Sequence, residues 1–146
     1  MPVSTPHGER FQLSVLFFIL ASALALWNFN FSAVLAAHGY ADIVRYAWAT
    51  NGVAAFISPL IVGAVADLRF SSERVLRWIG SGAAICLALL FWAIEERAHW
   101  GVVLGLAQLH ALWSVPTFGL ATSLVMSRLV RAKEEFGPVR VWATIG

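Results

Sequence analysis

Charged residues are absent from four long stretches of the chain, and this pattern dominates the sequence. The stretches cover residues 11–41, 46–66, 78–94 and 98–127, with lengths of 31, 21, 17 and 30 residues. A bilayer has a hydrocarbon core of about 30 Å, which an α-helix crosses in roughly 20 residues. Backbone amides in lipid must be bonded within their own segment, so helices are the expected form. We therefore predict an all-α integral membrane protein with transmembrane helices at about 11–37, 43–66, 75–94 and 100–127.

The two ends of the chain differ from these spans. Residues 1–10 are mostly polar and contain two prolines, and we interpret them as a short tail outside the membrane. Residues 138–146 are largely apolar and begin with proline, which is favoured at the first position of a helix. They predict that a fifth transmembrane helix starts at Pro138. Because that helix would have only about two turns here, we expect further helices to follow in a longer protein.

The basic residues indicate the orientation. If the N-terminus is cytoplasmic, eight basic residues lie on the inner side: Arg10, Arg69, Arg74, Arg77, Arg128, Arg131, Lys133 and Arg140. Only Arg45 and Arg97 then lie on the outer side. Inner loops of membrane proteins carry an excess of Lys and Arg, so we predict a plasma (inner) membrane protein with a cytoplasmic N-terminus. The basic residues are explained by topology, and nucleic acid is not an expected partner.

Composition narrows the function classes. The chain is 60% hydrophobic and 12% charged, with a mean hydropathy of +0.76, too apolar for the surface of a soluble domain. The sequence contains no metal-ligand cluster, no glycine-rich phosphate loop and no nucleophile–base pattern. We therefore predict neither an enzyme nor a bound metal or cofactor.

A charged connection follows the second predicted span. Gly63 and Asp67 are four residues apart at its end, and Arg74 follows in the connection. A carboxylate there can pair with an arginine or with a helix N-terminus, although an ordinary solvated charge is the alternative. The pattern resembles the loop signature of the major facilitator superfamily, in which such residues form a latch between two six-helix halves. Leu68 and Phe70 replace the basic residue and the glycine usual in that signature.

Three further segments resemble the nucleoside:proton symporter family. They are Gly-Val-Ala-Ala-Phe at 52–56 with Pro59 and 63–67, Pro-Thr-Phe-Gly-Leu at 116–120, and Phe-Gly-Pro-Val-Arg-Val-Trp-Ala-Thr-Ile-Gly at 136–146. The resemblance implies a twelve-helix major-facilitator-type bundle that works by alternating access around a midplane site. It also implies a nucleoside and a proton as partners, together with the lipid bilayer and the missing C-terminal helices.

The resemblance implies a substrate-binding role for Arg140 and Thr144, because the corresponding family residues line the central cavity. Residues four apart share one face of a helix, so both side chains can point into the same cavity. A guanidinium offers several donors to ribose or base oxygens, and a hydroxyl both donates and accepts. The alternative for Arg140 is a topology arginine near the membrane edge.

Three residues inside the spans are weaker candidates for lining the cavity: Asn28, His110 and Trp113. Asn28 and His110 are costly in hydrocarbon and should face the bundle interior or a wet cavity. His110 could relay a proton, or it could form a neutral hydrogen bond between helices. Trp113 could stack on a nucleobase, or it could pack against a neighbouring helix.

The favoured function is proton-coupled nucleoside uptake, and the sequence leaves two alternatives. The first is a small four-span packing or assembly subunit without transport activity. The second is a compact four-helix drug exporter, which needs an acidic residue in its first helix, and residues 11–41 contain none. Since no acid lies in any of the four spans, the coupling group is expected at His110 or on later helices.

Overall fold

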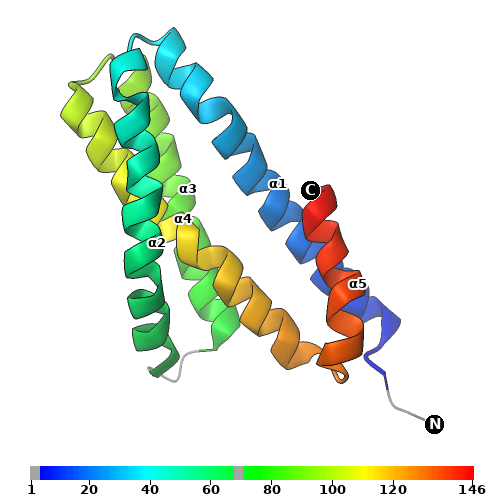
Figure 1. The fold of residues 1–146 in the computed structure, drawn as a ribbon. Helices are drawn as coiled ribbons and strands as arrows, with labels where there is room; N and C mark the ends of the chain where they lie inside the picture. The colour runs from blue at the N-terminus through cyan, green and yellow to red at the C-terminus, as the bar shows by residue number, and fades with distance from the viewer. Residues whose placement is uncertain (1–3, 68–70) are drawn as a thin grey trace. The chain divides into compact units, whose positions relative to one another are not determined.

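In the computed structural model, residues 4–67 and 71–146 are described, without the side chains of Pro59 and 61–67. These residues form five α-helices and one short 3₁₀ turn (Figure 1). Their bounds are α1 His7–Ala37, η1 Ala41–Ile43, α2 Val44–Asp67, α3 Ser72–Glu95, α4 Trp100–Arg128 and α5 Ala132–Ile145. The predicted all-helical fold is therefore confirmed. The chain divides into two compact units, one of Met1–Asn30 with Ala121–Gly146 and one of Phe31–Leu120.

Helix α1 begins at His7, four residues before the predicted span, so residues 7–10 are helical. The carbonyl of Pro6 accepts the N–H of Arg10 at 3.1 Å and closes the first turn. Glu9 in that turn interacts favourably with the positive end of the helix dipole. The charged residues Glu9 and Arg10 mark the end of the apolar stretch, but they are compatible with a helix. Helix α1 therefore extends beyond the apolar stretch at its N-terminal end.

The prediction that Pro138 is the first residue of the fifth helix is wrong. Helix α5 begins six residues earlier, at Ala132, and contains Pro138 in its interior. Its first turn closes on the carbonyl of Arg131, which accepts the N–H groups of Glu134 at 3.0 Å and Glu135 at 2.9 Å. Pro138 has no N–H, so it cannot donate a hydrogen bond to the carbonyl of the residue four positions earlier. The residue at that position is Glu134, which is exposed.

Three of the described helices are long and apolar enough to cross a membrane: α1, α3 and α4. Part of α2 lies outside the described side chains, and its role as a span remains a prediction. Large apolar side chains are exposed along the helices, for example Phe29 at 86% and Phe56 at 83%. Water would not tolerate apolar surface on this scale, whereas lipid or further helices would cover it.

In the unit of residues 31–120, α3 and α4 pack antiparallel. Buried positions on α3 fall at intervals of three, four or seven residues, with one adjacent pair at the end, as expected for one packed face: Val75, Ile79, Cys86, Leu90, Ala93 and Ile94. Near the start of α3, Val75 and Ile79 pack with Leu120 of α4. At the other end, the Tyr40 hydroxyl donates to the Ala98 carbonyl at 2.6 Å and ties the two turns together.

In the unit of Met1–Asn30 with Ala121–Gly146, α5 lies beside the first part of α1 (Figure 1). Phe17 and Phe136 meet edge to face, with ring centroids 6.1 Å apart. Further along α5, a Cβ added at Gly146 would lie 2.7 Å from the Ser22 hydroxyl oxygen. The two helices thus make contact at both ends of α5, and a glycine permits the close approach.

Candidate functional site

Helix α5 carries the two strongest predicted site residues on an exposed face. Arg140 and Thr144 are both exposed. The Arg140 guanidinium carbon lies 5.9 Å from the centre of the Phe136 ring, one turn earlier. Residues 136, 140 and 144 therefore form one row along the helix. The ring limits the directions that the guanidinium can take, and its donors remain available to a ligand.

The opposite side of α5 is buried. Glu135 is 5% exposed and Val139 is 2% exposed. At about 100° per residue, these two positions lie on the other side of the helix from Arg140 and Thr144. Helix α5 therefore has a buried face that fixes it in its unit and an exposed face that carries the predicted ligand groups.

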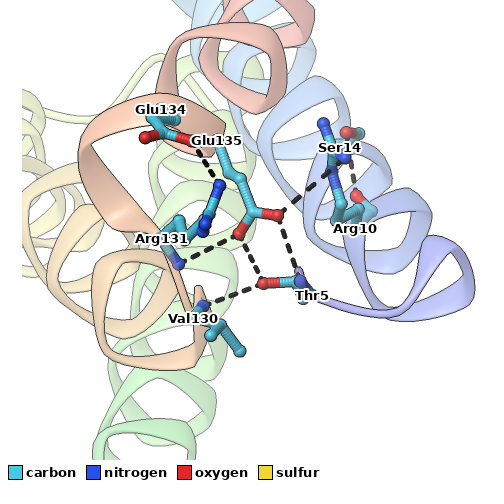
Figure 2. A network of polar contacts seen from close by, with 7 residues as sticks. All are labelled: Thr5, Arg10, Ser14, Val130, Arg131, Glu134 and Glu135. Atoms are coloured by element: carbon cyan, nitrogen blue, oxygen red, sulfur yellow. Dashed lines mark hydrogen bonds and ion pairs between the residues drawn. The ribbon is translucent and has the colours of Figure 1, made fainter. Parts of the chain in front are cut away.

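Glu135 is the centre of a polar network that joins the start of the chain to the start of α5 (Figure 2). The Thr5 backbone N–H donates to Glu135 Oε1 at 3.0 Å, and the Thr5 hydroxyl donates to Oε2 at 2.6 Å. The Arg131 N–H also donates to Oε2, at 3.2 Å, and the Arg10 guanidinium lies 4.0 Å from Oε1. These contacts satisfy a carboxylate that would otherwise be costly to bury.

The pKa of Glu135 is lowered from its ordinary value. The hydrogen bond from the Thr5 side chain is the largest cause, and burial opposes it by favouring the neutral form. The backbone N–H groups of Arg131 and Thr5 and the charge of Arg10 add to the lowering. Each of these groups stabilises the ionised carboxylate.

Two ion pairs lie near this network and are more exposed. Arg128 and Glu9 approach to 3.8 Å, and Arg131 and Glu134 to 3.0 Å. Exposed pairs of this kind contribute about 0–1 kcal/mol. They surround Glu135 without sharing its burial, so Glu135 is the residue that holds this end of the unit.

Sequence reasoning missed the pair of Thr5 and Glu135. The two residues are 130 positions apart, and no local spacing connects them. The available signal was an acidic residue at the start of a helix, the position where carboxylates bond free backbone N–H groups. That signal was obscured because the fifth helix was expected to begin after it, at Pro138.

Asn28 lies in the same unit as Arg140, on α1. Its side-chain amide donates to the Leu24 carbonyl one turn earlier, at 2.8 Å, and the residue is half-buried. This bond satisfies one amide hydrogen within its own helix, which lowers the cost of asparagine in an apolar segment. The role of Asn28 in lining a cavity remains a prediction.

His110 and Trp113 lie in the other unit, and both contact α3. The His110 Nδ1 atom is 3.0 Å from the Ala83 carbonyl oxygen, and since a carbonyl only accepts, Nδ1 carries the hydrogen. This contact is the hydrogen bond between helices that is the alternative to a proton relay at His110. The Trp113 ring lies against Gly82, where an added Cβ would come within 2.6 Å of it.

The predicted latch residues are only partly described. Gly63 and Asp67 belong to α2, which ends at Asp67, but their side chains lie outside the described part of the chain. Arg74 is exposed in the first turn of α3 and lines a hollow of about 470 Å³ with Ser71, Arg77, Trp78 and Ser81. The latch remains a prediction.

Comparison with known proteins places the chain in a family. Residues 8–146 match the sequence model of a family described as "Nucleoside H+ symporter". The chain is 26% identical, over 136 residues, to a protein of Escherichia coli (strain K12) described as "Putative nucleoside transporter YegT". That alignment covers 92% of this chain and 31% of the relative, so the chain spans about a third of the relative's length. No solved structure matches the chain. The family match extends over nearly the whole sequence, α5 with Arg140 and Thr144 included, and the chain belongs to the nucleoside H+ symporter family.

Proposed function

We propose that the gene product containing this chain takes up nucleosides together with protons across the plasma (inner) membrane. The family match over residues 8–146 is the observation that carries this proposal. A small packing or assembly subunit without transport activity is not favoured, because the match is to a family of transporters. The protein would be a major-facilitator-type bundle that alternates between inward-open and outward-open states.

Arg140 and Thr144 are the proposed substrate-binding residues. The exposed face of α5 supports this assignment, because both side chains lie on it and the opposite face is buried. The guanidinium would donate to ribose or base oxygens, and the threonine hydroxyl would donate or accept one turn further along the helix. Asn28, His110 and Trp113 are proposed as weaker candidates for cavity residues because of their positions inside the predicted spans. The contacts of His110 and Trp113 with α3 are those expected of packing residues.

The proposal also includes the orientation of the protein in the membrane and a latch at the end of α2. The N-terminus is placed in the cytoplasm on the distribution of Lys and Arg along the sequence. Asp67, with Gly63 and Arg74, would then hold the two halves of the protein together at the cytoplasmic side. The proposal assigns no metal and no cofactor.

The test is uptake of tritiated uridine and adenosine by cells that lack their own nucleoside transporters and express the intact gene. Arg140→Ala should reduce uptake by about tenfold to a hundredfold, because a hydrogen bond to a charged group contributes about 1.5–3 kcal/mol. The amount of protein in the membrane should stay the same, as measured on a fluorescent tag.

Arg45→Ala is a matched control, because Arg45 is also exposed and also stacks on an aromatic neighbour, Tyr46, at 4.7 Å. This variant should transport normally. If the wild type takes up neither nucleoside, the function is refuted. If the wild type transports and Arg140→Ala transports equally well, the site assignment is refuted. Loss of uptake when a protonophore collapses the proton gradient would support the coupling, and unaffected uptake would contradict it.

A further inference from the structure

Thr5 lies at the connection between α4 and α5, where it bonds Val130 in the connection and Glu135 in the first turn of α5 (Figure 2). Its hydroxyl accepts the backbone N–H of Val130 at 2.8 Å while donating to Glu135 at 2.6 Å. Thr5 is 2% exposed. A threonine hydroxyl has one hydrogen and can accept as well, so this single group satisfies a free backbone donor before the helix and the carboxylate inside it. The segment before α1 therefore contributes a specific contact to the start of α5.

Glu135 is held from two further directions. The Arg131 N–H bonds the carboxylate from the residue preceding α5, and Arg10 approaches it from α1. A side chain with several short, directional contacts has little freedom to move. Because Glu135 is in the first turn of α5, these contacts fix the rotation of the helix about its own axis as well as its position.

Helix α5 needs such an external constraint. It has 14 residues, about the length at which an isolated helix is marginal, and Pro138 removes one of its backbone hydrogen bonds. Its other contacts with α1 include the edge-to-face pair of Phe17 and Phe136 and the close approach of Gly146 to Phe18 and Ser22. Apolar packing is less directional than hydrogen bonding, so the polar network at Glu135 is the best-defined rotational constraint.

We propose that Thr5 and Glu135 are positioning residues, which orient α5 so that Arg140 and Thr144 face the substrate. This inference rests on the proposed function for its reference to substrate. The geometric part stands by itself. A rotation of α5 by one residue, about 100°, would turn Arg140 and Thr144 away from their present direction and expose part of the side that is now buried. Neither positioning residue touches the ligand. They act through the helix that joins Glu135 to Arg140.

The first experiment measures the orientation of α5 directly. In a Cys86→Ser background, which removes the single cysteine, new cysteines are placed at Val139 or Thr144 of the intact gene product. Membrane vesicles are then treated with a water-soluble maleimide. With Thr5 and Glu135 intact, the cysteine at 139 should react slowly and the cysteine at 144 quickly, because Val139 is buried and Thr144 exposed. Thr5→Val should reduce the difference in rate between the two sites by roughly tenfold, and Thr5→Ser should preserve it.

The second experiment measures uridine transport. Thr5→Val and Glu135→Gln should raise KM roughly tenfold, because a displaced binding group weakens substrate contacts, while the amount of inserted protein stays the same. Thr5→Ser keeps the hydroxyl and should restore the wild-type KM. Glu134→Gln is the matched control for Glu135→Gln. It makes the same change of charge at the adjacent residue, which is exposed and whose carboxylate pairs with the Arg131 side chain.

The outcomes separate this inference from the proposed function. Wild-type protein that transports neither uridine nor adenosine refutes the function, and the maleimide rates alone then decide whether Thr5 and Glu135 orient α5. If the wild type transports but both variants keep its KM and its maleimide pattern, the inference is overturned. A lower amount of inserted protein with unchanged KM and unchanged pattern also overturns it, because that result indicates a contribution to folding only.

Discussion

Gly82 is a glycine of α3 at which an added methyl group would meet a side chain of α4. A Cβ built on Gly82 would lie 2.6, 2.7 and 2.9 Å from three carbon atoms of the Trp113 ring. Ordinary contact between carbon atoms is about 3.5–4.0 Å, so the ring would have to move by about 1 Å. Trp113 is 37% exposed, but its neighbours on α4, His110 and Ser114, are buried and restrict how the ring can move. Gly82→Ala should therefore overpack this contact.

The loss of stability caused by Gly82→Ala is best measured relative to a matched variant, Gly80→Ala. Gly80 lies two residues earlier on α3, and no atom of the described residues comes within 4 Å of a Cβ added there. Both substitutions gain the same helix propensity, about 1 kcal/mol, so this term cancels between them. Overpacking costs about 1–3 kcal/mol, and Gly82→Ala should be less stable than Gly80→Ala by about 2 kcal/mol. For a chain of this size, the midpoint of thermal unfolding should fall by roughly 4–8 °C.

Cys86 provides the assay, because it is the single cysteine, lies one turn after Gly82 and is 6% exposed. A maleimide that fluoresces on reaction will label it only as α3 separates from its neighbours, so heating the protein in detergent gives an unfolding midpoint. Adding Trp113→Phe to Gly82→Ala should recover much of the loss, since a smaller ring relieves the contact. A midpoint for Gly82→Ala at or above that of Gly80→Ala would refute the reasoning.

The remaining predictions concern two polar contacts. Glu135 has a lowered pKa, so its contribution to stability is complete above its ordinary pKa of 4.5 and is lost as the pH falls through the lower pKa of the folded state. The stability difference between wild type and Glu135→Gln, from circular dichroism melts, should be constant from pH 5 to 8 and decrease below pH 4.5; a decrease between pH 6 and 7 would contradict this. Tyr40→Phe leaves the Ala98 carbonyl without its 2.6 Å partner and should cost about 1 kcal/mol in the same melts, and an unchanged midpoint would show that the bond contributes nothing.

The helices were predictable because the bilayer imposes a strict requirement on the sequence. Four charge-free stretches of about the right length gave helix positions that agree closely with α2, α3 and α4. The same reasoning predicts helix boundaries at charged residues and at proline, whereas α1 and α5 both begin earlier than those positions. Charged residues can extend a helix beyond the apolar stretch, as at Glu9, and proline can be accommodated inside one, as at Pro138.

The candidate site was predictable only where it depends on local spacing. The interval of four residues places Arg140 and Thr144 on one face of a helix wherever that helix begins. The contact between Thr5 and Glu135 depends on how α1, α4 and α5 pack, and no feature of either local sequence contains that information. The partner of His110 belongs to the same class, because the Ala83 carbonyl is a backbone group on another helix.

The contacts of Glu135 and His110 bear on where a proton could be carried in the proposed transport cycle. A proton carrier must gain and lose its proton as the protein changes state, and Glu135 is held ionised by three hydrogen bonds and a nearby arginine. It is therefore suited to positioning and unsuited to coupling. His110 keeps its Nδ1 hydrogen on Ala83, so a second proton would go to Nε2 and leave a positive charge in a buried place. Such a charge is costly unless water or an acid reaches it in one state of the cycle. In the proposed symporter, coupling at His110 would therefore require α3 and α4 to admit water or an acidic group beside it. The alternative is a proton carrier in the part of the transporter that corresponds to the unmatched two thirds of the relative.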